Sequence, residues 1–257
     1  MGVALNLDAF SLVGRTIAIT GANTGIGQGI AVAVARAGGR VVGIGRSAMD
    51  ETAALCRAAG ADFVAVTADL LGTDAAALLD GVWKKHGPLD GLVNNAGIIR
   101  RADAVDFTEA DWDDVMDVNL KAAFRLCQAY ARRVIATGAG RGKIVNIASM
   151  LSFQGGIRVA SYTASKSGLA GLTRLLACEW APLGITVNAI APGYIETNNT
   201  AALRHDPERA AAILARIPAG RWGRPDDIGA AAVFLLTPAS DYMNGAIVPV
   251  DGGWLAR

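Results

Sequence analysis

Cysteine and histidine are scarce in this sequence of 257 residues. The three cysteines, Cys56, Cys127 and Cys178, are odd in number, far apart and never paired as C-x-x-C. Neither a disulfide framework nor a zinc site is therefore predicted, and we expect small core residues and no metal. His86, at an expected helix end, and His205, in a polar loop, are poorly placed to serve a Ser-His-Asp hydrolase, and a G-x-S-x-G motif is missing.

The sequence also has no excess of one charge and no long apolar run. With 24 basic and 23 acidic residues, the net charge is +1, so the pattern typical of a nucleic-acid or anionic-membrane partner is missing. The longest apolar runs, such as Ala231–Leu236, are far shorter than a membrane span. Because the N-terminus has no basic start followed by an apolar stretch, we expect a cytoplasmic protein.

What the sequence does contain is an alternation of short β-branched runs with longer alanine-rich stretches. This pattern is typical of βαβ units around a parallel sheet, and 52% hydrophobic residues suffice for a large core. Without a linker or a repeat, residues 1–257 are expected to form one domain. The strand candidates are Thr16–Thr20, Arg40–Ile44, Phe63–Thr67, Gly91–Asn94, Lys143–Ile147, Thr186–Ile190 and Ile247–Val250, and helices are expected over Gly27–Ala37, Ala75–Lys85 and Ser161–Glu179.

Two segments depart from this rhythm. Thr108–Ala136 is too long for an ordinary helix, which predicts a bend near Asn119 or two overlapping helices. Residues 194–224 contain polar TNNT, a short helical AAAILARI and then PAGRWGRP. Such an interruption late in a doubly wound sheet is typical of a substrate loop or lid.

The first strand candidate is followed by a glycine-rich turn that opens a helix. Gly21, Gly25 and Gly27 permit a tight turn and a close approach of the backbone to a pyrophosphate, and the helix N-terminus supplies partial positive charge. The spacing G-x-x-x-G-x-G is not a Walker loop, which disfavours a kinase or nucleotide triphosphatase. The turn favours a dinucleotide, and the alternative is a βα turn without a ligand.

The end of the second strand bears on which dinucleotide binds. An NAD site usually has Asp or Glu there to hold the ribose 2′-OH, but this strand is followed by Gly45 and Arg46. A guanidinium can pair with a 2′-phosphate, which favours NADP. Alternatively, Arg46 stacks on the adenine or is an ordinary surface charge. After the third strand, Asp69 is placed to contact the adenine edge.

Ligands of an open parallel sheet bind beyond the carboxyl ends of its strands. There, NNAG (Asn94–Gly97) ends the fourth strand with residues small enough for a cofactor to lie against the backbone. Ser149 stands at the tip of the fifth strand. The turn after the sixth is the expected place for contacts to a nicotinamide carboxamide, from Pro192, Gly193, Ile195 and Thr197.

Tyr162 and Lys166 stand four residues apart among small residues, on one face of a helix. A phenol with a pKa of about 10 is a poor acid–base group at neutral pH, but an ammonium ~5 Å away would lower that pKa by roughly two units. We predict that Tyr162 exchanges a proton with a substrate oxygen and that Lys166 lowers its pKa and holds the cofactor ribose. Ser149 would hydrogen-bond the developing alkoxide or carbonyl, and Asn119 would fix a water that relays the proton.

Each feature alone has a plain structural interpretation. A Tyr–Lys pair at this spacing is often a surface pair, and a serine after a strand is often a helix cap. Their joint occurrence with the glycine turn and NNAG, all at expected strand ends, favours catalysis.

In TGANTGIG, NNAG, Asn119, Ser149, YTASK and PGYIET, the chain resembles the short-chain dehydrogenase/reductase family in its single-domain form. The resemblance implies a doubly wound (Rossmann-type) α/β fold, a seven-stranded parallel sheet with helices on both faces, hydride transfer with NAD or NADP, and a homotetramer. The residues then expected to bind the cofactor are Gly21, Asn23, Thr24, Gly25, Ile26, Gly27, Arg46, Asp69, Leu70, Asn95, Ala96, Gly97, Tyr162, Lys166, Pro192, Gly193, Ile195 and Thr197.

Longer strings such as NNAGIIRR, NIASMLSFQGGIRV and APGYIETNNT resemble members of that family that act on a keto-deoxy sugar acid of uronate breakdown, interconverted with a 2,5-diketo acid. Those members are generally assigned NAD, whereas Arg46 favours NADP, so both cofactors stay open. A small anionic substrate needs donors for its carboxylate and its hydroxyls. The candidates, each also readable as a surface residue, are Arg100, Arg101 and Arg158 for the carboxylate and Gln154, Asn198 and Asn199 for the hydroxyls.

Other functions are compatible with the same motifs. A 3-oxoacyl carrier-protein reductase or a polyol dehydrogenase would use this scaffold, with Arg100 and Arg101 as a basic patch for a carrier protein. A non-catalytic dinucleotide sensor is disfavoured, because it has no need of Tyr162, Lys166 and Ser149.

The chain ends in an apolar segment, AIVPVDGGWLAR. Trp254 and Leu255 lie past the last strand candidate, where water would otherwise surround them. They predict a C-terminal segment buried against a neighbouring subunit.

Overall fold

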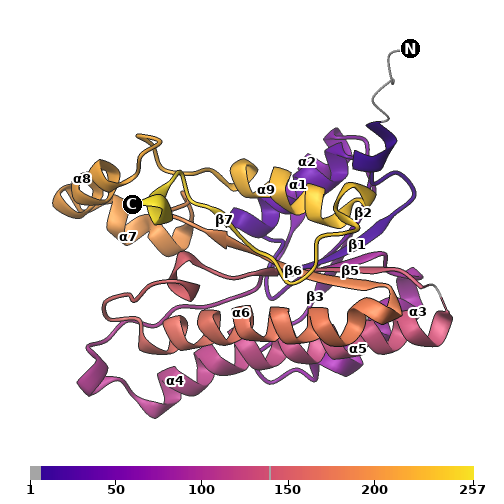
Figure 1. Cartoon of the computed structure of the whole chain (residues 1–257), viewed down its shortest axis with the longest axis horizontal. Coiled ribbons are helices and arrows are strands. Elements are labelled where there is room, and N and C mark those ends of the chain that lie inside the picture. Colours follow the sequence, from indigo (N-terminus) through magenta and orange to yellow (C-terminus); the bar gives the residue numbers. More distant parts are fainter. Residues whose placement is uncertain (1–6, 139) are drawn as a thin grey trace.

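The computed structural model of the protein describes residues 7–138 and 140–257, which are built on one parallel sheet (Figure 1). Its seven strands lie in the order β3-β2-β1-β4-β5-β6-β7. The predicted Rossmann-type fold and all seven predicted strands are confirmed, and only the ends of β2, β5 and β6 differ by one or two residues. The strands are β1 (Thr16–Thr20), β2 (Arg40–Gly45), β3 (Phe63–Thr67), β4 (Gly91–Asn94), β5 (Gly142–Ile147), β6 (Ile185–Pro192) and β7 (Ile247–Val250).

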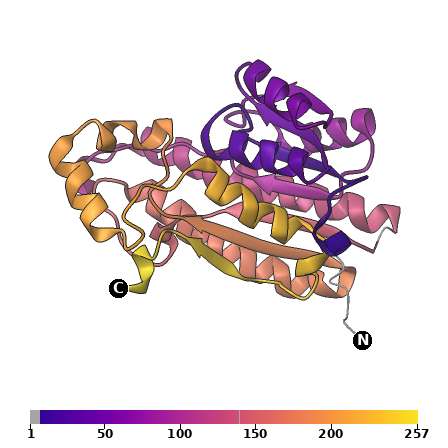
Figure 2. The same ribbon diagram turned by 90° about the horizontal axis from the view of Figure 1, so that it is seen from above.

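Helices cover both faces of the sheet (Figures 1 and 2). One hydrophobic core joins the sheet to α1, α2 and α9, and a second joins it to α3, α5 and α6. Because both faces are covered, β4 and β5 are buried along their whole length rather than at alternate residues. The helices are α1 (Gly25–Arg36), α2 (Asp50–Ala58), α3 (Ala75–His86), α4 (Glu109–Met116), α5 (Ala123–Thr137), α6 (Ala160–Trp180), α7 (Ala201–Arg204), α8 (Pro207–Arg216) and α9 (Pro225–Leu236).

The sheet has a switch point between β1 and β4. β1 pairs with β2 on one side and with β4 on the other, so the chain winds outward to β3 and returns to the middle of the sheet. In such a sheet, the crevice outside the carboxyl ends of the two strands is the usual ligand site. The glycine turn and the NNAG segment flank this crevice.

The long helical segment predicted over Thr108–Ala136 is interrupted where the sequence indicated. α4 and α5 are joined by a π-helical stretch, Asp117–Ala122, which contains Asn119. A π-helical stretch widens one turn of the backbone, and such stretches occur frequently at functional sites. Here the stretch places the buried side chain of Asn119 against the loop that follows β4.

Residues 194–224 carry α7 and α8, which lie beyond the sheet next to the C-terminus (Figure 1). A third hydrophobic cluster joins α8 to the C-terminal segment and includes Ile213, Ile217 and Trp254. Trp254 is only 4% exposed within its own chain, because a turn at Gly252 and Gly253, both at positive φ, folds the tail back onto the protomer. Contacts of the C-terminal segment with a neighbouring subunit stay a prediction.

The cysteines differ in their surroundings. Cys56 and Cys127 are buried, as predicted, but Cys178 is exposed. The expectation for Cys178 was wrong, because this residue lies on the exposed side of α6, whereas Leu176 and Ala177 before it are buried. Over the described residues, no helix is both long and apolar enough to cross a membrane.

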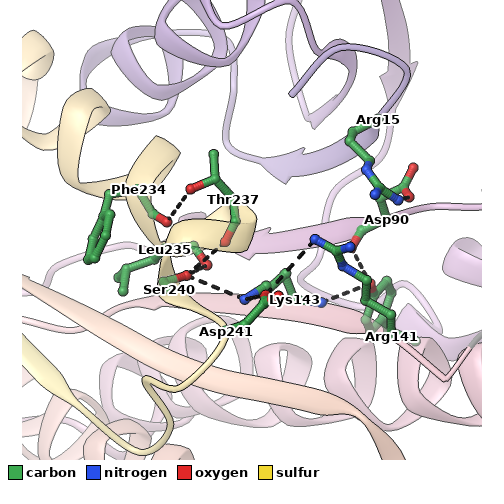
Figure 3. Close-up of polar contacts among 10 residues, drawn as sticks. Arg15, Asp90, Arg141, Lys143, Phe234, Leu235, Thr237, Ser240 and Asp241 are labelled. Atoms are coloured by element: carbon green, nitrogen blue, oxygen red, sulfur yellow. Dashed lines mark hydrogen bonds and ion pairs between the residues drawn. The ribbon is translucent and has the colours of Figure 1, made fainter. Parts of the chain in front are cut away.

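A polar cluster closes the end of the sheet where the strands begin (Figure 3). Lys143, at the start of β5, has a side chain that is only 4% exposed, and its Nζ lies 2.7 Å from Oδ1 of Asp241. The ammonium also donates to Oγ of Ser240 at 3.3 Å, and this hydroxyl donates to the carbonyls of Leu235 and Thr237. Burial lowers the pKa of Lys143, and the carboxylate of Asp241 opposes that shift.

Replacing Asp241 by asparagine is expected to lower the free energy of unfolding by about 1–2 kcal/mol, because a nearly buried ammonium then has no counter-charge. Urea unfolding at pH 7 measures the change. Asp226→Asn is the matched control, since the Arg36–Asp226 pair is 3.8 Å apart and both side chains are mostly exposed. Equal effects of the two substitutions would show that the Lys143–Asp241 pair contributes no more to the free energy of unfolding than an exposed ion pair does.

Candidate active site

The turn after β1 is built from backbone that has no room for side chains. Gly21 and Gly25 adopt left-handed conformations, with φ of 66° and 57°. At Gly27, an added Cβ would collide with the carbonyl oxygen of Gly21. The turn therefore brings bare backbone and the N-terminus of α1 together, which fits the pyrophosphate of a dinucleotide.

A cleft of about 340 Å³ runs from this turn to α6. Its wall contains most of the predicted site residues, namely Gly21, Asn23, Thr24, Gly25, Ile26, Arg46, Asp69, Leu70, Asn95, Ala96, Gly97, Arg100, Tyr162, Lys166, Thr197, Asn198 and Asn199. The motifs did not identify Ile44, Ala68, Leu71, Ile98, Val118 and Ile147, which also line it. The only signal for these apolar residues was their position next to a strand end or a motif residue.

Four predicted cofactor residues lie outside the wall of this cleft: Gly27, Pro192, Gly193 and Ile195. Ile195 is 3% exposed and forms a β-bridge with Gly223, and a Cβ on Gly193 would lie 2.7 Å from the Cα of Asp251. Gly193 therefore lies against the C-terminal segment, and Ile195 joins the two ends of the 194–224 segment. The contacts of Pro192, Gly193 and Ile195 to a nicotinamide stay a prediction.

Asn95 ties the fourth strand to the glycine turn. Its Nδ2 donates to the carbonyls of Thr20 and Gly21, at 2.9 and 3.2 Å. The backbone N–H groups of Asn95 and Ala96 both donate to Oγ1 of Thr20. The amide of Asn95 therefore holds the two sides of the crevice together, and its backbone forms part of the wall.

The end of β2 is polar without being acidic. A Cβ on Gly45 would lie 3.1 Å from Oδ1 of Asn23, whose Nδ2 donates to Oγ of Ser47 at 2.7 Å. A carboxylate at position 45 would need a shift of Asn23. Arg46 is exposed at the rim of the cleft, and no ion pair of its guanidinium is found within the described residues.

Tyr162 and Lys166 lie on one face of α6, as their spacing predicted. The Nζ of Lys166 is 5.7 Å from the centroid of the Tyr162 ring. This ammonium is buried, and it donates to the carbonyl of Ile147 at 2.6 Å. Burial lowers the pKa of Lys166 to about 8, because only one carbonyl replaces the water around the charge.

The pKa of Tyr162 in the chain without ligands is raised. Burial raises this pKa, while hydrogen bonding to Ser149 and the charge of Arg101 lower it by smaller amounts. The ammonium of Lys166 lies over the ring of Tyr162, and the cost of burying the phenolate exceeds the nearby attractions. The lowering of this pKa by Lys166 together with a positively charged nicotinamide stays a prediction.

Asn119 and Ser149, two of the predicted catalytic residues, do not line this cleft, and both hold backbone groups. Oδ1 of Asn119 accepts the N–H of Ile98 at 2.8 Å, and its Nδ2 donates to the carbonyl of the same residue at 2.9 Å. Nδ2 also lies 3.3 Å from Oγ of Ser165 on α6. Oγ of Ser149 accepts the N–H of Leu151. The predicted water relay through Asn119 stays a prediction.

The three candidate arginines differ in their partners. Arg100 pairs with Asp111 and Asp114, each at 3.1 Å. Arg158, which has a φ of 64°, pairs with Asp103 at 3.1 Å. Arg101 instead donates to the carbonyl of Asn199 at 2.9 Å, and no carboxylate partner of Arg101 is found over residues 7–138 and 140–257. Of the three candidates, Arg101 is therefore the one that can bind a substrate carboxylate without first breaking an ion pair.

The three candidate amides also divide. Asn198 and Asn199 line the cleft, whereas Gln154 does not, and its Oε1 accepts a hydrogen bond from the indole of Trp254 at 3.2 Å. In the part of the chain that the structure describes, no three His, Cys, Asp or Glu side chains gather as a metal site.

A doubly wound parallel sheet with this glycine turn and with serine, tyrosine and lysine at its carboxyl edge is the arrangement of a dinucleotide-dependent oxidoreductase. The chain belongs to the short-chain dehydrogenase/reductase family. The family model that matches residues 21–255 is described as enoyl-(acyl carrier protein) reductase.

Relatives with assigned activities match almost the whole chain. The 2-dehydro-3-deoxy-D-gluconate 5-dehydrogenase of Escherichia coli K12 is 58% identical and covers 98% of this chain and 99% of its own. The enzyme of that name from Bacillus subtilis 168 is 53% identical, with 97% and 98% covered. A structure from Agrobacterium tumefaciens, provisionally assigned as a 2-deoxy-D-gluconate 3-dehydrogenase with bound NADP, is 60% identical and covers 97% of this chain and 100% of its own at a TM-score of 0.93.

Proposed function

We propose that the protein is an NAD(P)-dependent oxidoreductase that interconverts a secondary alcohol and a ketone on a keto-deoxy sugar acid, 2-dehydro-3-deoxy-D-gluconate. The observation that carries the proposal is the juxtaposition of Tyr162 and Lys166 with Arg101, which has no carboxylate partner among the described residues and whose charge acts on the Tyr162 hydroxyl. The names of the relatives that match the whole chain support the substrate class.

In the proposed mechanism, the nicotinamide cofactor supplies or accepts the hydride. The Tyr162 hydroxyl exchanges the proton with the substrate oxygen, and the Ser149 hydroxyl, which interacts with it, orients that oxygen. Lys166 holds the ribose beside Tyr162. Asn119 fixes Ile98 and so keeps the loop after NNAG open to the cofactor.

Arg46 is the residue that would distinguish the two cofactors. Its exposed guanidinium, near the Asn23–Ser47 pair, is placed to bind a 2′-phosphate, and the Agrobacterium structure contains NADP. Both NAD and NADP are therefore proposed, with NADP favoured by this site. The 194–224 segment, from which Asn198 and Asn199 reach the cleft, is proposed as the substrate loop.

Arg101 is proposed to bind the substrate carboxylate. Arg101→Met is expected to raise KM for the sugar acid by roughly 10- to 100-fold, since a charge-assisted hydrogen bond is lost, with a much smaller change for a neutral polyol. Steady-state kinetics with both substrates measures this. Arg158→Met is the control, because Arg158 is already paired with Asp103. Equal changes in the two variants would remove Arg101 from the carboxylate site.

The experiment that tests the function is the initial rate of nicotinamide absorbance change with 2-dehydro-3-deoxy-D-gluconate, run with NAD and with NADP. Turnover supports the proposal, and the ratio of the two rates reports the cofactor preference. No turnover with either cofactor contradicts it. The description of the family model favours an acyl-carrier substrate as the second candidate, and a 3-oxoacyl thioester run in parallel tests it.

The assembly and location are also proposals. We expect a homotetramer in the cytoplasm, with a small molecule rather than nucleic acid or a membrane as the partner. Light scattering after size exclusion gives the mass of the assembly, and a monomer would contradict the tetramer.

A further inference from the structure

Trp254 connects three segments that surround the active site. Its ring lies 4.8 Å from that of Tyr194, which follows β6, in an edge-to-face arrangement. The guanidinium of Arg216, at the end of α8, lies over the indole at 4.0 Å. Its Nε1 donates to Oε1 of Gln154, 100 residues earlier in the sequence.

The hydrogen bond determines which way the Gln154 amide points. An indole N–H can donate but cannot accept, so the atom of Gln154 that faces Trp254 has to be the oxygen. The NH2 group is therefore turned away from Trp254. No hydrogen bond of this NH2 group occurs within residues 7–138 and 140–257. Both N–H groups of this amide are therefore without an acceptor among the described residues.

Gln154 is rigidly linked to the catalytic helix. Its N–H donates to the carbonyl of Met150, in the turn that follows Ser149. Oγ of Ser152 donates to the carbonyl of Lys166 at 2.7 Å, and Oγ of Ser167 donates to the carbonyl of Leu151. The segment from Ser149 to Gln154 is thus hydrogen-bonded to α6 at two points.

Trp254 is itself held on its other side. The carboxylate of Asp251 accepts the N–H groups of Gly253 and Leu255, each at 2.9 Å. Arg257 donates to the carbonyl of Ala215 in α8 at 2.9 Å. The indole is therefore a fixed point to which a side chain can be oriented, rather than a mobile end of the chain.

We propose that Trp254 is a positioning residue for substrate recognition, which holds the Gln154 amide with its NH2 group directed toward the hydroxyls of the sugar acid. The proposal rests on the proposed function.

The test is a double-mutant cycle with Trp254→Phe and Gln154→Ala. Trp254→Phe keeps an aromatic ring for Tyr194 and Arg216 but removes the donor. We expect KM for the sugar acid to rise about three- to tenfold in each single variant, with kcat within about twofold and KM for the cofactor unchanged. In the Gln154→Ala background, Trp254→Phe should add almost nothing, because the two residues act through one hydrogen bond. Trp83→Phe, which alters a buried ring next to Tyr130 in the core and outside the cleft wall, is the matched control and should leave KM unchanged.

The outcomes separate the proposals. A wild-type protein without turnover contradicts the proposed function. The hydrogen bond is then tested by NMR, where the indole N–H resonance of Trp254 is identified by its loss in Trp254→Phe. This resonance should shift in Gln154→Ala. If the wild type is active, two results overturn the positioning role and leave Trp254 as a packing residue. One is that the effects of the two substitutions on KM for the sugar acid are additive. The other is that kcat and KM for the cofactor change as much as KM for the sugar acid. An unshifted resonance overturns the positioning role as well.

Discussion

Replacing Tyr162 by phenylalanine is expected to reduce kcat by roughly 10²- to 10⁴-fold while leaving cofactor affinity and folding nearly unchanged. The substitution removes only the hydroxyl, which is the atom proposed to exchange the proton with the substrate. The ring that packs under the Lys166 ammonium remains. Steady-state rates and a fluorescence titration with the cofactor separate the two effects.

The control for this substitution is Tyr242→Phe, because Tyr242 is fully exposed and does not line the cleft. It should retain the wild-type rate. If Tyr162→Phe keeps activity within about tenfold of wild type, another group carries the proton and the assignment is wrong.

The raised pKa of Tyr162 also predicts the pH dependence of the reaction. Because the phenol stays protonated at neutral pH, alcohol oxidation, which needs a proton acceptor, should speed up as the pH rises toward this pKa. Ketone reduction, which needs a proton donor, should slow down only as the pH approaches it. A rate profile that is flat in both directions would contradict Tyr162 as the titrating group.

Replacing Lys166 by methionine is expected to abolish efficient turnover and yet to stabilise the ligand-free protein at neutral pH. The pKa of Lys166 is about 8 in the folded protein, against 10.5 in an exposed lysine. Below pH 8 the lysine is charged in both states, and burial costs the folded protein up to about 3 kcal/mol. This cost shrinks as the pH rises from 8 to 10.5, because the folded state has already released the proton.

The net gain is smaller than that cost, since methionine leaves the carbonyl of Ile147 without its donor. We expect Lys166→Met to raise the free energy of unfolding by about 1–2 kcal/mol at pH 7, with the difference fading toward pH 10.5. Urea unfolding without cofactor at several pH values measures this. The exposed Lys121, changed to methionine, serves as the control and should show no such dependence. A destabilised Lys166→Met protein at pH 7 would show that the ammonium contributes to folding.

Local patterns predicted most of the framework. The β-branched runs marked all seven strands because parallel strands buried on both faces have to be apolar along their length. Gly21 and Gly25 marked the turn because its left-handed backbone excludes side chains. Tyr162 and Lys166 were recognisable because one helical turn places them on the same face.

Contacts between segments that are distant in the sequence could not be predicted from local patterns. Arg100, Arg101 and Arg158 looked alike in sequence, and only the folded chain pairs two of them with carboxylates and leaves the third to Asn199. Cys178 was misjudged because its exposure depends on which face of α6 meets the sheet.

The sequence by itself determined the order of the elements, the bare glycine turn and the residue types at the strand ends, since these depend on backbone sterics and on neighbours within a few positions. The tertiary structure decided the direction of the Tyr162 pKa shift, which of the three candidate arginines has no carboxylate partner among the described residues, and the place of Trp254. Those properties depend on burial and on partners up to 100 residues away, and desolvation and charge act through space rather than along the chain.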